Sequence, residues 1–278
     1  ISWMAWFEYS ALAGTNNIYG TSDSNPFGGN VWARGPKPVL ANVTSMSWSS
    51  VQQVYFYTSL FNDTSVCWYT AFPYIWISSF ENILISPCET VLDIAAMDAA
   101  YSVSQNLWVI VGRGSTHNMA YASNLAGPWT GFGPTGNNNT IVSVNFIPFA
   151  GIWIFGDSTI TSDPRTVAVS STLQTPLTTI NGCAYDAQRL RIVCAGIGPS
   201  DTLAYSADGS SWTGLGNTIF TSQGNDVAYN DGVWMAVGNG NNAQVASSLD
   251  GTTWNVISTN VFNGTLGGAL VVEPTFIQ

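Results

Sequence analysis

The stretch from Gly224 to Ile257, GNDVAYNDGVWMAVGNGNNAQVASSLDGTTWNVI, is the best-defined unit in this chain. Four runs of strand length, DVAY, VWMAV, QVASS and TWNVI, are rich in Val, Ala and aromatic residues. They are separated by NDG, GNGNN and LDGT, whose Gly, Asn and Asp accept positive φ or initiate turns. The pattern predicts a four-stranded antiparallel meander. One such sheet leaves its apolar faces exposed, so it needs neighbours of the same kind.

The neighbours appear as a repeat of the second-strand run. Taking Trp234 as the marker of that strand, the spacings back along the chain are 42, 40, 44, 54 and 51 residues, and the marker positions are Ile192, Ile152, Trp108, Val54 and Trp3. A repeat of four short strands at this period is typical of a β-propeller blade. The sequence therefore predicts an all-β fold, a six-bladed β-propeller of four-stranded antiparallel blades.

The blade boundaries follow from the same markers. One propeller domain over 1–278 is expected, with its ring closed by the C-terminal segment LGGALVVEPTFIQ, which supplies the first strand of the blade that contains Trp3. The approximate blades are 265–278 with 1–39, then 40–88, 89–140, 141–179, 180–220 and 221–264. The 54-residue interval predicts an insertion around Phe80 to Asp93 in the second blade.

The turn between the third and fourth strands carries a more specific signature. SADGSSW and SLDGTTW share the pattern S-x-D-G-x-x-W, and SNLAGPW keeps only the Ser and the Trp, so the turn residues are Ser206, Asp208, Gly209, Trp212, Ser248, Asp250, Gly251, Trp254, Ser123 and Trp129. The pattern resembles the Asp-box, or bacterial-neuraminidase (BNR) repeat, of the sialidase-like β-propeller superfamily. In that superfamily the box is usually a structural turn remote from the ligand site, so the resemblance implies the fold more than a function.

Composition limits the function classes. Only 8% of the residues are charged, and the net charge of −10 argues against nucleic acid or an anionic membrane surface as a partner. The longest apolar runs, such as LWVIV, have the length of a strand, so no membrane insertion is expected. Low charge with abundant Gly, Asn, Ser and aromatic residues favours a secreted, extracellular protein. No cofactor or metal is expected.

The four cysteines can be placed by strand register. If Tyr185 pairs with Ile192, as Tyr229 approaches Trp234, then Cys183 lies opposite Cys194 and a cross-strand disulfide is expected. Cys67 and Cys88 would then pair with each other. The alternative is four buried free thiols in a reducing compartment. The absence of C-x-x-C spacing argues against zinc.

Four N-x-S/T sequons predict a glycoprotein if the chain is secreted by a eukaryote: Asn42, Asn62, Asn138 and Asn263. So many Asn, Ser and Thr residues produce about this number of matches by chance. Their placement is better evidence than their number, because Asn138 and Asn263 fall in predicted loops between blades.

Catalytic candidates come from the loops on the face opposite the Asp-box turns. A sialidase-like site would use Arg34, Arg113 and Arg165 to clamp a carboxylate, because guanidinium groups bind that anion in a bidentate manner. The Arg-Ile-Pro opening of that family is absent, and no clear Tyr/Glu nucleophile pair is found. Scattered arginines are more often surface groups.

Other groups give equally weak indications of catalysis. A Ser-His-Asp triad would need His117, the single histidine, and an isolated loop histidine is mostly a solvated polar residue. Asp157, Asp163 and Asp201 could face one another as paired acids do in glycosidases. Turns favour Asp for local reasons, however. We therefore expect no enzymatic activity and name no catalytic residue.

Two functional classes remain. The first is a non-enzymatic structural or adhesive propeller, the self-assembling subunit of a filament or surface coat, with terminal segments Ile1–Tyr9 and Val271–Gln278 at a subunit contact that includes Trp3, Trp6 and Phe276. The second is a carbohydrate-binding, lectin-like propeller in which exposed aromatic residues stack on sugars. A sialidase-like glycosidase is the least favoured of the alternatives.

Overall fold

A computed structural model describes residues 4–10, 15–21, 33–34, 42–49, 51–52, 54–61, 64–71, 84–132, 140–166, 175–240, 243–258 and 270–272. Within these ranges every strand pairs antiparallel, and the helical segments are two 3₁₀ turns, η3 (Cys88–Thr90) and η4 (Pro164–Thr166). The predicted all-β class of antiparallel sheets is confirmed, and among the described residues five sheets have the predicted four strands and one has three. The chain divides into two compact units, Pro38–Thr172 and Ile1–Lys37 with Leu173–Gln278.

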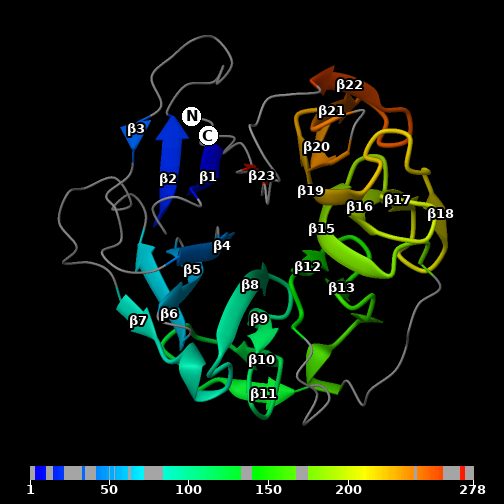
Figure 1. Cartoon of the computed structure of the whole chain (residues 1–278). Helices are drawn as coiled ribbons and strands as arrows, with labels where there is room; N and C mark the ends of the chain where they lie inside the picture. The colour runs from blue at the N-terminus through cyan, green and yellow to red at the C-terminus, as the bar shows by residue number, and fades with distance from the viewer. Residues whose placement is uncertain are drawn as a thin grey trace. The chain divides into compact units, whose positions relative to one another are not determined.

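The unit Pro38–Thr172 contains three sheets (Figure 1). The first has β4 (Asn42–Ser49), β5 (Val54–Phe61), β6 (Thr64–Ala71) and β7 (Leu84–Ser86); the second has β8 (Ala95–Ser102), β9 (Leu107–Arg113), β10 (Met119–Ala122) and β11 (Thr130–Phe132); the third has β12 (Val144–Ile147), β13 (Ile152–Phe155) and β14 (Ile160–Thr161). Strands β4, β8 and β12, which begin their sheets, lie next to one another.

The other unit contains three more sheets of the same design. They are β23 (Leu270–Val272), β1 (Met4–Ser10), β2 (Thr15–Thr21) and β3 (Ala33–Arg34); then β15 (Thr179–Asp186), β16 (Arg191–Ile197), β17 (Leu203–Ser206) and β18 (Trp212–Gly214); then β19 (Gln223–Asn230), β20 (Val233–Asn239), β21 (Val245–Ser248) and β22 (Asn255–Ser258). Here too the first strands β15 and β19 are neighbours.

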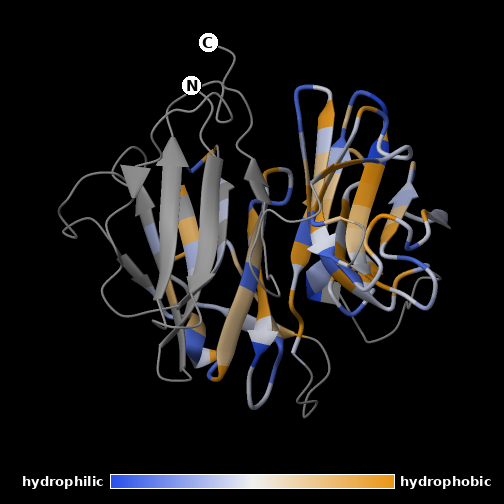
Figure 2. Ribbon diagram, turned by 45° about the horizontal axis from the view of Figure 1, so that its top comes forward, coloured by the Kyte–Doolittle hydropathy of each residue, from blue (hydrophilic) through white to orange (hydrophobic). Residues whose placement is uncertain are grey.

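The cores lie between successive sheets, as expected for sheets that cannot bury their own faces. One core packs Phe56 against Trp108, and a second packs Val109 against Trp153 across the next junction. In the other unit Val193 and Trp234 share the core between the β15–β18 and β19–β22 sheets. Figure 2 shows the apolar strands of these sheets in orange and the more polar turns in blue. Burial between sheets therefore explains why the strands are apolar on both faces.

The register corrects two of the repeat markers. Trp234 lies opposite Tyr229, and the equivalent partners are Tyr101 with Trp108 and Phe146 with Trp153, each an aromatic pair with ring centroids less than 5 Å apart. The marker of the β12–β14 sheet is therefore Trp153, not Ile152. By the same register Tyr55, not Val54, is the equivalent residue in β5. Spacing alone cannot distinguish adjacent apolar residues, whereas pairing assigns each to a face.

Segments from the two ends of the sequence form one sheet. Strand β23 pairs antiparallel with β1 through Met4–Val272, Ala5–Val271 and Trp6–Leu270, and β1 in turn pairs with β2. This is the sheet for which the C-terminal segment was predicted to supply the first strand. Trp6 lies in β1, whereas Trp3 and Phe276 lie outside the described residues.

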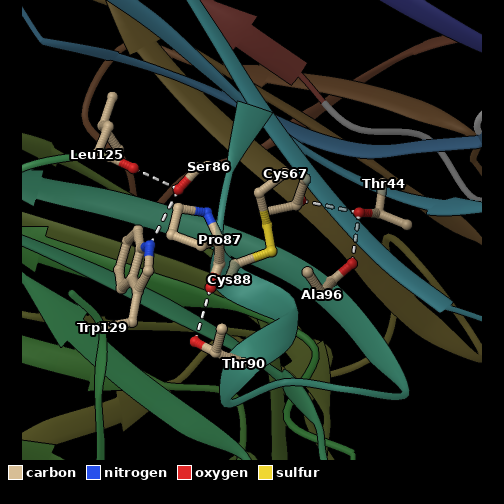
Figure 3. The surroundings of a disulfide bond; sticks show 10 residues. Thr44, Cys67, Ser86, Pro87, Cys88, Thr90, Ala96, Leu125 and Trp129 are labelled. Atoms are coloured by element: carbon tan, nitrogen blue, oxygen red, sulfur yellow. Dashed lines mark hydrogen bonds between the residues drawn. A yellow bond between two sulfur atoms is a disulfide. The ribbon is translucent and has the colours of Figure 1, made fainter. Parts of the chain in front are cut away.

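Two disulfides join the same cysteine pairs that the register predicts. Cys183 lies directly opposite Cys194, with Cα atoms 4.1 Å apart. Cys67 on β6 is bonded to Cys88 in η3, with Cα atoms 5.9 Å apart, so the third strand of that sheet is linked to the turn after its fourth (Figure 3). No free cysteine is found.

Among the described residues, no helix has the length and apolar character needed to cross a membrane.

Candidate functional site

The first strands share an irregularity, and it lies next to a buried carboxyl group whose pKa is raised. In four sheets the pairing of first and second strands skips one residue, at Thr44, Met97, Asn181 and Asn225. Such a β-bulge leaves the extra residue outside the ladder and turns its side chain away from the regular alternation. The bulges therefore allow polar groups to reach from one first strand to the next.

Thr44 and Asn181 make equivalent contacts across such junctions. The Thr44 hydroxyl donates to the Ala96 carbonyl at 2.8 Å, and the Asn181 side-chain amide donates to the Gly224 carbonyl at 2.7 Å. Each acceptor, Ala96 or Gly224, comes directly before the bulge residue in the first strand of the neighbouring sheet. The bulge side chain thus bonds one sheet to the next at one junction in each unit.

The residue after the bulge in β8 is Asp98, whose carboxylate connects three sheets. It accepts hydrogen bonds from the Ser45 hydroxyl of β4, from the Val144 backbone N–H of β12 at 2.9 Å, and from the Ala99 N–H at 2.8 Å. The Ser47 hydroxyl also donates to the Ala99 carbonyl. One carboxylate therefore satisfies donors on three adjacent strands that have no sheet partner of their own there.

Burial controls the charge of this group. The loss of hydration around Asp98 raises its pKa to about 6, although the hydrogen bonds from Ser45, Val144 and Ala99 act to lower it. A carboxyl group with this pKa changes its protonation between mildly acidic and neutral pH. The arrangement can therefore bind and release a proton, and within the described residues no cluster of metal-ligating side chains surrounds it.

Asp226 occupies the equivalent position in β19. Its carboxylate accepts the Val227 N–H at 2.8 Å and lies against Gly182, the residue after the bulge in β15. A Cβ built on Gly182 would lie 2.0 Å from an Asp226 carboxylate oxygen, so glycine is required there for close approach. The sequence signal for both aspartates is an Asp directly before a pair of small or apolar residues, Ala99-Ala100 or Val227-Ala228.

The Asp-box turns are built from local hydrogen bonds. The Ser206 hydroxyl accepts the Gly209 N–H at 2.8 Å, and one Asp208 oxygen accepts the N–H groups of Ser210 and Ser211, both at 2.8 Å. These N–H groups, led by that of Ser211, hold the Asp208 pKa well below its usual range. Gly209 has φ of 75°, which favours glycine.

The second Asp-box copy repeats this geometry. The Ser248 hydroxyl accepts the Gly251 N–H at 2.8 Å, and Asp250 accepts the N–H groups of Thr252 and Thr253, both at 2.7 Å. The Trp254 indole folds back and donates to the Gly251 carbonyl at 3.3 Å, as Trp212 does to Gly209 at 3.1 Å. Every polar group of the motif is used inside the turn, so the motif builds structure.

The degraded copy uses its tryptophan differently. The Trp129 indole N–H donates to the Ser86 hydroxyl at 2.9 Å, and Ser86 donates to the Leu125 carbonyl at 2.5 Å (Figure 3). Ser86 ends β7 of the preceding sheet, two residues before Cys88. In this copy, which lacks the Asp of the Asp-box, the tryptophan therefore joins two adjacent sheets next to the Cys67–Cys88 disulfide.

A third kind of contact joins adjacent sheets at the turns after the first strands. The Gln52 side-chain carbonyl accepts the Trp108 indole N–H at 2.8 Å, and that of Gln105 accepts the Trp153 indole N–H at 2.9 Å. Both glutamines are anchored three residues after a serine whose hydroxyl accepts their backbone N–H. We call this contact the Gln–Trp clasp.

The arginines of the predicted clamp have separate roles. Arg34 lies in β3, and Arg113 is the exposed last residue of β9. Arg165 is bound by its neighbour Asp163 through Nε–Oδ1 at 2.8 Å and Nη2–Oδ2 at 2.9 Å. A substrate carboxylate would need this same pair of hydrogen bonds from Arg165, and the Asp163 carboxylate already accepts both of them.

The other predicted catalytic groups serve local structure. Asp157 accepts the Thr159 N–H at 3.0 Å, and Asp201 accepts the Gly216 N–H at 2.7 Å. The His117 ring packs on Gly131, where a Cβ would lie 2.3 Å from it, and its Nδ1 is buried without a hydrogen-bond partner. Within the described residues no hydrogen bond or ion pair joins any two of these groups, so the paired-acid and triad interpretations gain no support.

Of the six tryptophans whose side chains the structure describes, four that could form a sugar-binding platform are core residues, and Trp212 and Trp254 are partly exposed. Trp108, Trp153 and Trp234 are fully buried, and Trp129 is nearly so. Of the sequons, Asn42 begins β4, while Asn62, Asn138 and Asn263 fall outside the described residues. Occupancy of the sequons stays a prediction.

These sheets define an all-β, β-propeller-like protein. No family model matches the chain, and no curated relative matches it. A chain in the crystal structure of a nidogen/laminin complex has a TM-score of 0.62 at 10% identity, and the alignment covers 89% of each chain. At this identity the likeness shows the fold alone. The computationally designed Ika8 protein aligns over 90% of this chain and 72% of that chain with 14% identity, but its TM-score of 0.46 carries no argument.

Proposed function

We propose that this chain is a non-enzymatic extracellular structural protein. In this proposal its six sheets are the blades of one closed propeller, and copies assemble by exchanging strand β23. Two disulfides support an oxidising compartment, because such bonds persist outside the cytosol. The β-propeller-like neighbour comes from a complex of nidogen with laminin, so a fold of this kind can serve protein assembly.

The observation that carries the proposal is the short pairing of β23 with β1. Within the part of the chain that the structure describes, three residue pairs join the two strands, whereas β1 and β2 are joined by seven. A strand held by so few ladder positions costs little to detach, and the edge of β1 that it leaves is a template for an identical strand from another copy. Exchange of an identical element is an accessible route to self-association.

Engineered disulfides can distinguish pairing within a chain from pairing between chains. Ala5 and Val271 are register partners in β1 and β23, so the variant Ala5→Cys/Val271→Cys should oxidise across this pair. We expect covalent dimers and higher species on non-reducing gels, increasing with protein concentration. The native cysteines are already paired with each other and so leave the new thiols to react together.

The matched control uses the neighbouring hairpin. Ala5 also pairs with Gly20 in β2, which is joined to β1 by a short connection, so Ala5→Cys/Gly20→Cys should cross-link within one chain only. If the Val271 variant gives monomeric cross-links alone at every concentration, β23 pairs only within its own chain and the exchange proposal is wrong.

A further inference from the structure

The Trp234 indole lacks the hydrogen bond that its counterparts make. The structure describes the side chains of six tryptophans, and five of them donate from Nε1 to an acceptor. Trp234 is fully buried, and its Nε1–H has no partner. A buried donor without an acceptor is costly, typically by about 1–3 kcal/mol in proteins. This position therefore requires an explanation.

The missing acceptor can be traced to one residue. Gln52 and Gln105 stand three positions after Ser49 and Ser102, where β4 and β8 end, and Arg189 stands three positions after Asp186, where β15 ends. Asp186 replaces the anchoring serine and accepts the Arg189 backbone N–H at 3.2 Å. Arg189 has no acceptor atom, so the Gln–Trp clasp cannot form with Trp234.

A second unsatisfied donor lies at the same junction. Arg191, opposite Asp186 in the β15–β16 hairpin, lies over the Tyr205 ring with its Cζ 4.8 Å from the centroid, and its buried Nε–H has no partner. Tyr205, like Trp234, belongs to the core between the β15–β18 and β19–β22 sheets. Within the described residues no carboxylate is ion-paired with Arg191.

Arg189 connects these groups. Its Nη1 donates to Asp186 at 2.8 Å and to the Tyr229 hydroxyl at 3.3 Å, and the Tyr229 ring contacts Trp234 with centroids 4.6 Å apart. The Arg189 side chain is 51% exposed, so its displacement would uncover the groups beneath it. The acidic neighbour is Asp186, whose carboxylate is ion-paired with Arg189.

We propose that the junction between the β15–β18 and β19–β22 sheets is a binding site for a carboxylate, which accepts hydrogen bonds from Trp234 and the Arg191 guanidinium. A carboxylate has the planar shape of the glutamine carboxamide that fills the equivalent place in the Gln–Trp clasps. Its charge matches the unpaired Arg191, and guanidinium–carboxylate bonds are among the stronger hydrogen bonds in proteins. The carboxylate comes from a free monocarboxylate or from a second copy of this chain.

Indole ¹H–¹⁵N NMR tests this site directly. Sodium acetate is titrated against sodium chloride at matched ionic strength, with the Trp234 signal assigned from a Trp234→Phe spectrum. We expect a saturable downfield shift of the Trp234 indole proton, while the Trp108 and Trp153 signals stay fixed because their N–H groups are already bonded. A shift that appears on raising the protein concentration without acetate identifies a second copy as the source.

Two substitutions make the test specific. Arg189→Gln should rebuild the clasp, so that the Trp234 signal moves to the position typical of Trp108 and no longer responds to acetate. Arg191→Met should weaken acetate binding by about tenfold or more, because it removes a charged donor. The proposal is wrong if the wild-type Trp234 signal does not respond to acetate or to protein concentration, or if Arg189→Gln responds as the wild type does.

Discussion

Asp98 joins three sheets through the hydrogen bonds of one buried carboxylate. Its carboxylate accepts from Ser45, Ala99 and Val144 on three first strands, yet burial raises its pKa to about 6. The unfolded value is near 3.8, so the folded chain holds the proton more tightly than the unfolded chain does. The contribution of this group to stability is therefore greatest at low pH and is lost as the pH rises from about 4 to 6.

Asp98→Asn removes this dependence. We expect the free energy of unfolding of the variant, relative to wild type, to increase between pH 4 and 6.5, by on the order of 2 kcal/mol. Urea denaturation at several pH values measures it. Asp93→Asn is the control with the opposite sign: burial acts to raise the Asp93 pKa, but the Ser115 N–H and hydroxyl outweigh it and the net shift is downward. The prediction is contradicted if the difference in the free energy of unfolding between Asp98→Asn and wild type stays constant from pH 4 to 6.5.

Substitutions at Asp250 test how much the hydrogen bonds of the Asp-box turn contribute to stability. Asp250→Ala removes the acceptor of the Thr252 and Thr253 N–H groups, so we expect a lower melting temperature by calorimetry. Asp250→Asn keeps a side-chain oxygen and should lose much less. Equal losses in both variants would show that charge, not the hydrogen-bonded turn, is what the motif supplies.

Residues were predictable from the sequence where a local pattern defined them. The S-x-D-G-x-x-W motif located Ser206, Asp208 and Gly209, because all of their bonds lie within one turn. Asp98 could not be identified in this way, since its partners Ser45 and Val144 are 53 and 46 positions away. A β-bulge sets the direction of the side chain, and its position cannot be predicted reliably from a single sequence.

At the level of elements, some contacts between adjacent sheets recur at more than one junction, as the Gln–Trp clasp does at Trp108 and Trp153. Gln52→Leu removes the acceptor of the buried Trp108 indole, and we expect a loss of about 1–3 kcal/mol in the free energy of unfolding. Gln188→Leu is the matched control, because Gln188 is an exposed turn glutamine. Equal urea midpoints for the two variants would show that the clasp contributes nothing to stability.

The Cys67–Cys88 disulfide closes a segment of 21 residues between β6 and η3. Replacing both cysteines with serine should cost about 3 kcal/mol, since the unfolded chain regains the freedom of that loop. Chemical denaturation of the double variant measures this loss. Intact mass before and after reduction checks the pairing itself, and four free thiols without reduction would contradict it.

The elements themselves followed from hydrophobic pattern and turn residues. The hairpin register that places Tyr185 opposite Ile192 was predictable because a two-residue side-chain period leaves few alternatives. Ile152 was misassigned because Ile152 and Trp153 are both apolar, and only the pairing of Phe146 with Trp153 identifies the residue that faces its aromatic partner.

At the scale of the whole molecule, the proposed exchange of β23 between copies of the chain can be tested by removing this strand. A chain lacking residues 270–278 cannot donate the strand, so we expect it to stay monomeric at concentrations where the full chain associates. Size-exclusion chromatography with light scattering measures this. Association of the shortened chain to the same extent would place the contact elsewhere. The repeat predicted the sheets, but the function of the assembled molecule depends on surfaces that no periodic pattern encodes.

The pairing of β1 with β23 also has a consequence for biosynthesis. During translation β1 is made before every other described strand, and β23 is made after all of them. The sheet that contains β1 must therefore remain incomplete while every other sheet has already been synthesised. Chaperones that shield exposed strand edges would be needed longest at β1, and a ribosome stalled before Leu270 would release a chain in which β1 is paired with β2 on one edge but lacks β23 on the other.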